Sequence, residues 1–240
     1  MGRQAVVSGG GTGIGAAVAR ALAEDGFQVV IVGRRASVLE ATARELGDAV
    51  RPVVADLTSV PDVERLASTV DGQVDVLVNN AGGFDLDRED GLAGTADWWR
   101  RVYDSNVISA VLLTEALRDR LAHPAGRVIL LSSVAAQRGR AGPYSAAKAA
   151  LHGWAYDLAR DLGPHGATVN VIAPGYVAET EFFGGRLTEE GHATRVAETL
   201  VGRAGRPADI AAAVRYLAGP DSGYVTGQIL SINGGIVFGR

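Results

Sequence analysis

The sequence contains no cysteine, which excludes disulfide bonds and thiolate chemistry. Histidine is also scarce. The four histidines stand at positions 123, 152, 165 and 192, and this spacing matches no set of metal ligands. We therefore expect no metal site in this protein.

Long apolar runs and an excess of basic charge are missing as well. No stretch approaches about 18 apolar residues, and the N-terminus lacks a basic segment followed by an apolar one. Neither a membrane span nor a signal peptide is predicted. The net charge of −4 offers no basic field for nucleic acid. We expect a cytoplasmic protein with no membrane or nucleic-acid partner.

The N-terminal segment has the pattern strand, glycine turn, helix, strand. Residues 4–7 are a short apolar run that leads into Ser8 and the glycine-rich residues 9–15. A helix pattern follows to about Asp25, and residues 27–32 are almost entirely apolar. Glycines let the backbone approach a pyrophosphate, and the helix N-terminus attracts it with free N–H groups. The alternative is a glycine turn without a ligand.

A tyrosine and a lysine stand four residues apart in a second predicted helix. Pro143 suits the first helical position, so Tyr144 and Lys148 are predicted to share a helix face. An ammonium beside a phenol favours the phenolate, and we expect Lys148 to lower the pKa of Tyr144 toward neutrality. The alternative is a simple surface pair.

The alternation of strand and helix patterns predicts an α/β fold with a parallel sheet. Strands are expected near residues 4–8, 27–32, 50–54, 74–78, 126–132, 167–173 and 228–232. Ligands of such sheets bind at the carboxyl ends of the strands. Ser8, Asp56, Asn79, Ser132 and Pro174 all fall at such ends, so one shared crevice is predicted.

Together these motifs resemble the short-chain dehydrogenase/reductase family, in its compact branch that includes 3-oxoacyl thioester reductases. Ser8 replaces the threonine of the family's glycine motif, in which Gly9, Gly13 and Gly15 match. Further matches follow in family order at 56–57, 79–82, 106, 132–133, 144–148 and 174–175. The resemblance implies a single Rossmann-type, doubly wound domain over residues 1–240 with a seven-stranded parallel sheet.

The resemblance assigns four catalytic residues. Tyr144 would exchange the proton with the substrate, and Lys148 would tune Tyr144 and bind the nicotinamide ribose. Ser133 would hold the substrate oxygen, and Asn106 would keep a water beside Lys148. Asn106 could instead be a buried amide that ties two helices together. Ser132 is the alternative to Ser133, and the eleven residues from Ser133 to Tyr144 are fewer than the resemblance implies.

Cofactor choice is predicted at the end of the second strand. Arg34 and Arg35 stand where a carboxylate would bind the ribose of NAD, and a guanidinium suits a 2′-phosphate. We expect NADP(H), with Arg34 the main contact, and the resemblance implies that Asp56 contacts the adenine. The alternatives are that both arginines lie in solvent at the start of the next helix and that Asp56 is a helix or turn cap. The full set of expected cofactor residues is Ser8, Gly9, Gly11, Thr12, Gly13, Ile14, Gly15, Arg34, Arg35, Asp56, Leu57, Asn80, Ala81, Gly82, Tyr144, Lys148, Pro174, Gly175, Val177 and Thr180.

A substrate flap is expected over about residues 176–206. Phe182 and Phe183 precede Gly184 and Gly185, which suits either a mobile apolar lid or packing anchors. Trp98 and Trp99 are interpreted as helix packing residues.

The predicted activity is hydride transfer between a nicotinamide and a ketone or secondary alcohol. Its substrate would be a 3-oxoacyl thioester, a small ketone, a polyol or a secondary metabolite. One alternative is a non-catalytic NADP(H)-binding regulator or scaffold, which intact Tyr144 and Lys148 argue against. The other is a nucleotide-sugar epimerase or dehydratase, which the glycine spacing disfavours. The resemblance also implies a homotetramer.

Overall fold

The computed structural model describes residues 2–85, 87–121, 123–183 and 187–238. Its centre is a seven-stranded, all-parallel sheet in the order β3-β2-β1-β4-β5-β6-β7. The strands are β1 (Gln4–Ser8), β2 (Gln28–Gly33), β3 (Val50–Val54), β4 (Val76–Asn79), β5 (Arg127–Leu131), β6 (Thr168–Pro174) and β7 (Ile229–Ile232). The predicted α/β class and sheet are confirmed.

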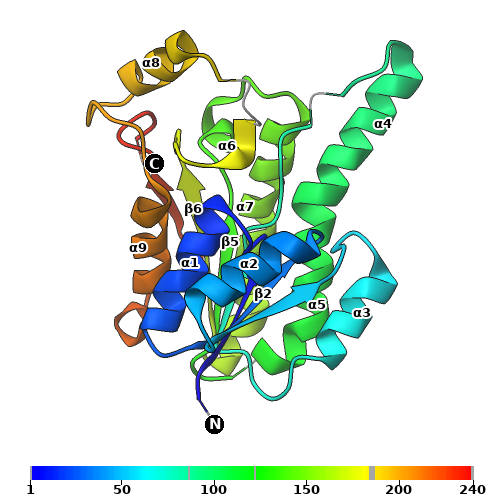
Figure 1. Ribbon diagram of the computed structural model, residues 1–240, viewed down its shortest axis with the longest axis vertical. Helices are drawn as coiled ribbons and strands as arrows, with labels where there is room; N and C mark the ends of the chain where they lie inside the picture. Colours follow the sequence, from blue (N-terminus) through cyan, green and yellow to red (C-terminus); the bar gives the residue numbers. More distant parts are fainter. Residues whose placement is uncertain (1, 86, 122, 184–186, 239–240) are drawn as a thin grey trace.

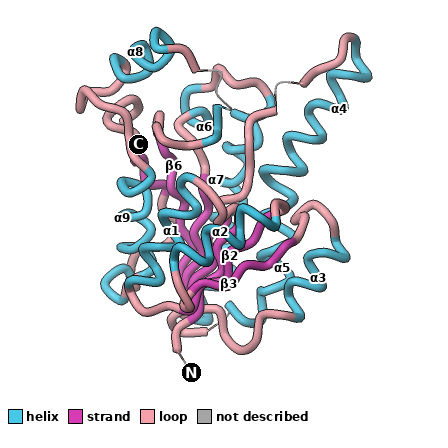
Figure 2. Tube along the Cα trace, in the orientation of Figure 1, coloured by secondary structure: helices cyan, strands magenta, loops and turns pink. Residues whose placement is uncertain are grey.

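Helices connect successive strands and cover both faces of the sheet (Figure 1, Figure 2). The α-helices are α1 (Gly13–Glu24), α2 (Ala36–Leu46), α3 (Val60–Ser68), α4 (Gly91–Tyr103), α5 (Ser109–Leu121), α6 (Ala135–Arg138), α7 (Pro143–Leu162), α8 (Glu189–Ala197) and α9 (Pro207–Ala218). Short helices are η1 (Asp104–Ile108, a π-helix) and the 3₁₀ turns η2 (Gly163–His165), η3 (Glu181–Phe183) and η4 (Pro220–Ser222).

Alternation along the strands divides the core into two layers. Val7 and Ile31 pack with residues of α1, α2 and α9 on one face. Val6 and Val30 pack with residues of α3, α5 and α7 on the other. Because neighbouring side chains in a strand point to opposite faces, strands buried on both sides are almost uniformly apolar.

The chain reverses its winding direction between β1 and β4, which are neighbours in the sheet. Such a switch point opens a crevice at the carboxyl ends of the strands. In Figure 1, α8 and the first turns of α4 rise on either side above these ends. Within the described ranges, no helix combines the length and the apolar character that crossing a membrane requires.

Candidate active site

The turn between β1 and α1 needs glycine at the positions where its backbone segments come closest to each other. Gly9 and Gly13 have φ values of +65° and +51°, which side-chain-bearing residues rarely adopt. A Cβ on Gly15 would lie 2.0 Å from the carbonyl oxygen of Gly9. This contact draws the N-terminus of α1 against the end of β1. The side chain of Thr12, the N-cap residue, makes no capping hydrogen bond, so it does not occupy the N–H groups of the first turn.

Ser8 and Asn80 bind each other and join the carboxyl ends of β1 and β4. The Ser8 hydroxyl accepts hydrogen bonds from the backbone N–H groups of Asn80 (3.0 Å) and Ala81 (2.9 Å). The Asn80 amide donates to the carbonyl oxygens of Ser8 (2.9 Å) and Gly9 (3.2 Å). Both side chains therefore shape the crevice by holding its two walls together.

Tyr144, Ser133 and Lys148 come together above β5. Ser133 follows the end of β5, and its side chain is hydrogen-bonded to Tyr144 in the first turn of α7. Lys148 Nζ lies 5.7 Å from the centre of the Tyr144 ring and donates to the carbonyl oxygen of Leu131 at 2.9 Å. Tyr144 is 7% exposed and Lys148 is 4% exposed. The phenol of Tyr144, the hydroxyl of Ser133 and the buried amine of Lys148 thus lie close together.

Burial controls the ionisation of this group. It raises the pKa of Tyr144 to about 12. The hydrogen bond with Ser133 lowers this pKa, but by less than burial raises it. Burial also lowers the pKa of Lys148 to about 8. Burial therefore shifts the pKa of Tyr144 upward, opposite to the direction expected from a neighbouring ammonium, because it desolvates the phenolate. Tyr144 stands as a neutral phenol, ready to donate a proton.

The preceding serine has a different set of partners. Ser132 Oγ donates to the backbone carbonyl of Lys148 at 2.8 Å and lies 2.8 Å from Nε2 of His152. The alternation expected at the end of a strand explains why Ser132 and Ser133 point in different directions. Only Ser133 of the two is placed to hold an oxygen next to Tyr144.

Asn106 lies in η1, the π-helical turn between α4 and α5. Its amide nitrogen donates to the carbonyl oxygens of Gly83 (2.9 Å) and Val102 (2.9 Å), and Oδ1 accepts from the N–H of Gly83 (3.1 Å). A Cβ on Gly82 would lie 2.5 Å from Asn106 Oδ1 and 3.0 Å from Lys148 Nζ. The side chain thus anchors the loop after β4 beside Lys148, rather than tying two helices together.

Comparisons with known proteins agree with this geometry. A family model described as Enoyl-(Acyl carrier protein) reductase matches residues 9–237. The chain is 35% identical to the 3-oxoacyl-(acyl-carrier-protein) reductase FabG of Vibrio cholerae serotype O1, over 98% of this chain and 97% of the relative. It is 39% identical to the short-chain reductase protein NovJ of Streptomyces niveus, over 96% and 92% respectively.

A solved structure, that of a variant actinorhodin polyketide ketoreductase with NADPH, matches at 32% identity with a TM-score of 0.84. The match covers 98% of this chain and 97% of that one. The chain belongs to the short-chain dehydrogenase/reductase family. It is accordingly an oxidoreductase that acts on a ketone or alcohol with a nicotinamide cofactor.

The crevice of this short-chain dehydrogenase/reductase fits a dinucleotide. The turn over residues 9–15 brings bare backbone and a helix N-terminus to the switch point, and such surroundings favour a pyrophosphate. Some of the other expected cofactor residues make contacts within the protein itself. The carbonyl oxygen of Gly11 accepts from Thr42 at 2.8 Å, Leu57 is buried, and Ile14 packs against the core.

The two arginines after β2 differ in their partners. Arg35 Nη2 lies 2.6 Å from the carboxylate of Glu181, across the crevice in η3. Arg34 is exposed at the same edge. The pKa of Asp56 is lowered, first by hydrogen bonds from the backbone N–H and hydroxyl of Thr58 and further by the charge of Arg34. Arg34 and Asp56 therefore lie close enough to share one ligand region.

The segment expected as a flap starts from a fixed base. Gly175 packs so closely on Asn233 that a Cβ would lie 2.8 Å from its Cα. Val177 forms a parallel bridge with Gly205, which pins the two ends of the segment together. Thr180 crosses the crevice, and its methyl carbon would be 3.2 Å from a Cβ on Gly13. The side chain of Phe183 and both Gly184 and Gly185 lie outside what the structure describes.

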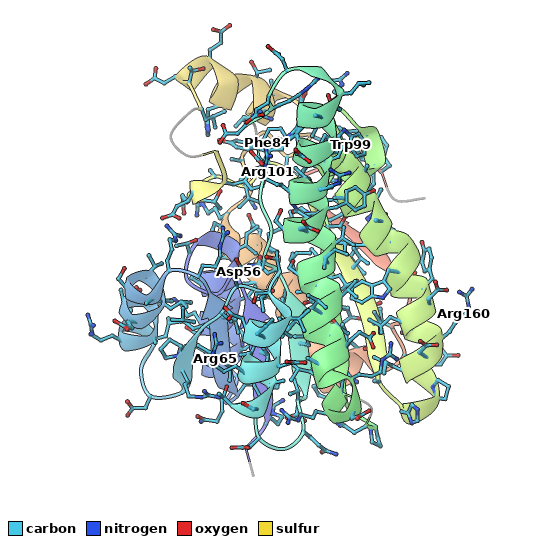
Figure 3. All side chains as sticks on the ribbon, turned by 90° about the vertical axis from the view of Figure 1, so that its right-hand side faces the viewer. Asp56, Arg65, Phe84, Trp99, Arg101 and Arg160 are labelled. Atoms are coloured by element: carbon cyan, nitrogen blue, oxygen red, sulfur yellow. The ribbon has the colours of Figure 1, made fainter. Side chains whose placement is uncertain are left out.

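Phe84 is a site residue that sequence reasoning missed. Its ring packs edge-on against Tyr144, with centroids 5.6 Å apart. The signal was its position two residues after Gly82, the last residue of the motif that follows β4. Figure 3 places Phe84 beside Arg101 on the flank of α4, with Trp99 on the opposite edge of the helix. Trp98 donates to the carbonyl oxygen of Asp85 at 2.8 Å, consistent with a packing role.

Proposed function

We propose that this protein is an NADP(H)-dependent carbonyl reductase or alcohol dehydrogenase in which Tyr144 is the general acid and base. The observation that supports this most is the cluster of Ser133 with the buried Tyr144 and Lys148 at the end of β5, at the same edge of the sheet as the glycine turn. When bound, the nicotinamide supplies or accepts a hydride. The chain's own residues supply the proton and the polar contacts to the oxygen.

In the direction of reduction, the carbonyl carbon takes up the hydride and its oxygen takes up a proton. Tyr144 gives that proton, since its hydroxyl is neutral and hydrogen-bonded to Ser133. The Ser133 hydroxyl donates to the same oxygen as its charge grows. Lys148 places a positive charge near the phenolate that remains, and Asn106 holds the loop beside it.

The preference for NADP(H) is assigned to Arg34. It is exposed at the end of β2, whereas the neighbouring Arg35 is engaged with Glu181. A guanidinium forms charge-assisted hydrogen bonds with a phosphate, worth about 1.5–3 kcal/mol. We expect Arg34→Asp to shift the NADPH/NADH ratio of kcat/KM by about ten- to a hundredfold toward NADH. Arg35→Asp is the matched control and should shift it far less, and an unchanged ratio in Arg34→Asp would overturn the assignment.

The organisation proposed with this function is one domain over residues 1–240, carrying the flap at about 176–206, assembled as a homotetramer. The bridge between Val177 and Gly205 supports a flap that moves on a fixed base. Light scattering at micromolar concentration tests the assembly, and a monomer would contradict it.

The activity itself is tested by following NADPH absorbance with purified protein and a panel of ketones and 3-oxoacyl thioesters. Tyr144→Phe keeps the ring packing but removes the donated proton, and it should lower kcat by about 10²–10⁴. NADPH oxidation that survives in Tyr144→Phe would refute the role of Tyr144.

A further inference from the structure

The catalytic tyrosine is enclosed by aromatic rings from two distant parts of the chain. Phe84, from the loop after β4, meets Tyr144 edge-on at 5.6 Å and 86°. Phe182, from η3 in the flap, lies 5.6 Å from the same ring at 59°. These two rings also face each other, with centroids 6.4 Å apart and planes inclined by 29°. Two phenyl rings therefore close over the ring of Tyr144.

A flat ring suits this aromatic surface. Carbon atoms in contact lie about 3.5 Å apart, so a ring inserted between two others needs them about 7 Å apart. At 6.4 Å the rings of Phe84 and Phe182 touch each other, so a substrate ring enters between them only when Phe182 moves outward. Aromatic rings gain about 0.5–1.5 kcal/mol per stacked or edge-on contact beyond the burial of their area. A flexible acyl chain lacks that gain and loses rotamer freedom when it is held between rings.

The charges in the segment that carries Phe84 disfavour an anionic substrate. The loop that carries Phe84 continues through Asp85, Asp87, Glu89 and Asp90, against one arginine, Arg88. Arg101, on α4, is paired with Asp85 at 2.9 Å. These acids follow Phe84 directly in the chain and make this segment negatively charged.

Two arginines that follow Ser133 in the chain should attract a phosphate only weakly. Arg138, the last residue of α6, lies 2.8 Å from the carboxylate of Glu198, and both side chains are partly buried. Arg140 is exposed two residues further on, and its φ of +74° places it in a tight turn. The ion pair with Glu198 neutralises the charge of Arg138.

We infer that the substrate of this site is a compact, uncharged ketone, or the matching alcohol, that carries an aromatic ring beside the reacting carbon. This inference rests on the proposed oxidoreductase function and narrows it. It separates this chain from relatives whose names give a carrier-bound 3-oxoacyl substrate.

The test compares matched ketones with NADPH as the reductant. 2-Tetralone and trans-2-decalone place the carbonyl alike and differ in the aromatic ring, and we expect kcat/KM to be about tenfold higher for 2-tetralone. Acetoacetyl-coenzyme A and the acetoacetyl thioester of N-acetylcysteamine differ in their phosphates, and the uncharged thioester should be the better of the two.

Variants of Phe84 and Phe182 test whether these two rings cause the preference for 2-tetralone. Phe84→Leu and Phe182→Leu should each bring the ratio between 2-tetralone and trans-2-decalone toward one, because leucine keeps the apolar surface but has no ring face. Tyr224→Leu is the control, since Tyr224 is fully exposed away from the site, and it should leave the ratio unchanged.

The outcomes separate the two proposals. Equal turnover of the two ketones, or a preference for acetoacetyl-coenzyme A, would overturn the substrate inference and leave the oxidoreductase function intact. A ratio that persists in both leucine variants would also overturn it. Failure to oxidise NADPH with any ketone or thioester would contradict the proposed function, and the substrate inference would fall with it.

Discussion

The hydroxyl oxygen of Ser132 lies 2.8 Å from Nε2 of His152, and the same hydroxyl donates to the backbone carbonyl of Lys148 at 2.8 Å. This pair joins the end of β5 to the middle of α7. The next residue, Ser133, is hydrogen-bonded instead to Tyr144. Two adjacent serines thus have separate partners, His152 and Lys148 for Ser132 and Tyr144 for Ser133.

We expect alanine variants of these serines to affect different measurements. Ser133→Ala removes the hydroxyl beside Tyr144 and should lower kcat by about a hundredfold while leaving the thermal midpoint nearly unchanged. Ser132→Ala leaves buried groups without a partner and should lower the free energy of unfolding by about 1–3 kcal/mol, with most activity retained. Turnover and urea denaturation of both variants check this. A dead Ser132→Ala beside an active Ser133→Ala would reverse the assignment.

The buried charge of Lys148 should lower the free energy of unfolding. Burial lowers its pKa from 10.5 to about 8, so the folded state binds its proton less tightly than the unfolded state does. The cost is present in full below pH 8 and disappears as the pH rises through 10.5. We therefore expect Lys148→Met to raise the free energy of unfolding at pH 7 by about 1–3 kcal/mol while abolishing turnover.

Denaturant titrations of Lys148→Met and the parent protein at pH 7 and pH 10 measure this effect. The difference between the two proteins should shrink at the higher pH. A variant that is less stable than the parent at pH 7 would show that the hydrogen bond from Lys148 to Leu131 outweighs the desolvation of the ammonium.

The fold could be predicted from the sequence because its signals are local. Strands buried on both faces are continuous apolar runs, and glycine turns and proline mark their ends. The strand expected over 74–78 is found at Val76–Asn79, since Val74 bonds instead to the carbonyl oxygen of Arg120. The position of the crevice could also be predicted, because the motifs stand at the carboxyl ends of the strands.

The parts that sequence could not supply depend on contacts between distant residues. The ion pair of Arg35 with Glu181 joins positions 146 residues apart. The phenol of Tyr144 is buried by Phe84 and Phe182, which no local pattern links to it, and this burial reversed the expected pKa shift. The π-helical turn around Asn106 likewise has no local sequence signature.

The ionisation of Lys148 predicts the pH dependence of reduction. Below about pH 8 the amine is charged, and above it the charge is lost, whereas Tyr144 keeps its proton up to about pH 12. The rate of ketone reduction should therefore be level at neutral pH and fall as the pH rises above 8. Initial rates of NADPH oxidation between pH 6 and pH 10 measure the profile. A profile that stays level to pH 10 would mean that the charge of Lys148 does not assist the reduction.

The glycine turn offers a sharp steric test. A methyl group on Gly15 would lie 2.0 Å from the Gly9 carbonyl oxygen and 2.6 Å from the Asn80 amide, so α1 must move away from β1. We expect Gly15→Ala to lower the free energy of unfolding by about 1–3 kcal/mol and to weaken NADPH binding at least tenfold. Fluorescence titration with NADPH and urea denaturation measure the two effects.

Gly163→Ala is the matched control for this substitution. Gly163 has helical dihedral angles of −55° and −45°, and a Cβ there meets nothing within 4 Å. Alanine restricts the unfolded chain at a position whose conformation it tolerates, so stability should be unchanged or rise by about 0.4–1 kcal/mol, with NADPH affinity unaltered. If Gly15→Ala bound NADPH as tightly as Gly163→Ala, the close approach of α1 to β1 would not be what forms the pyrophosphate site.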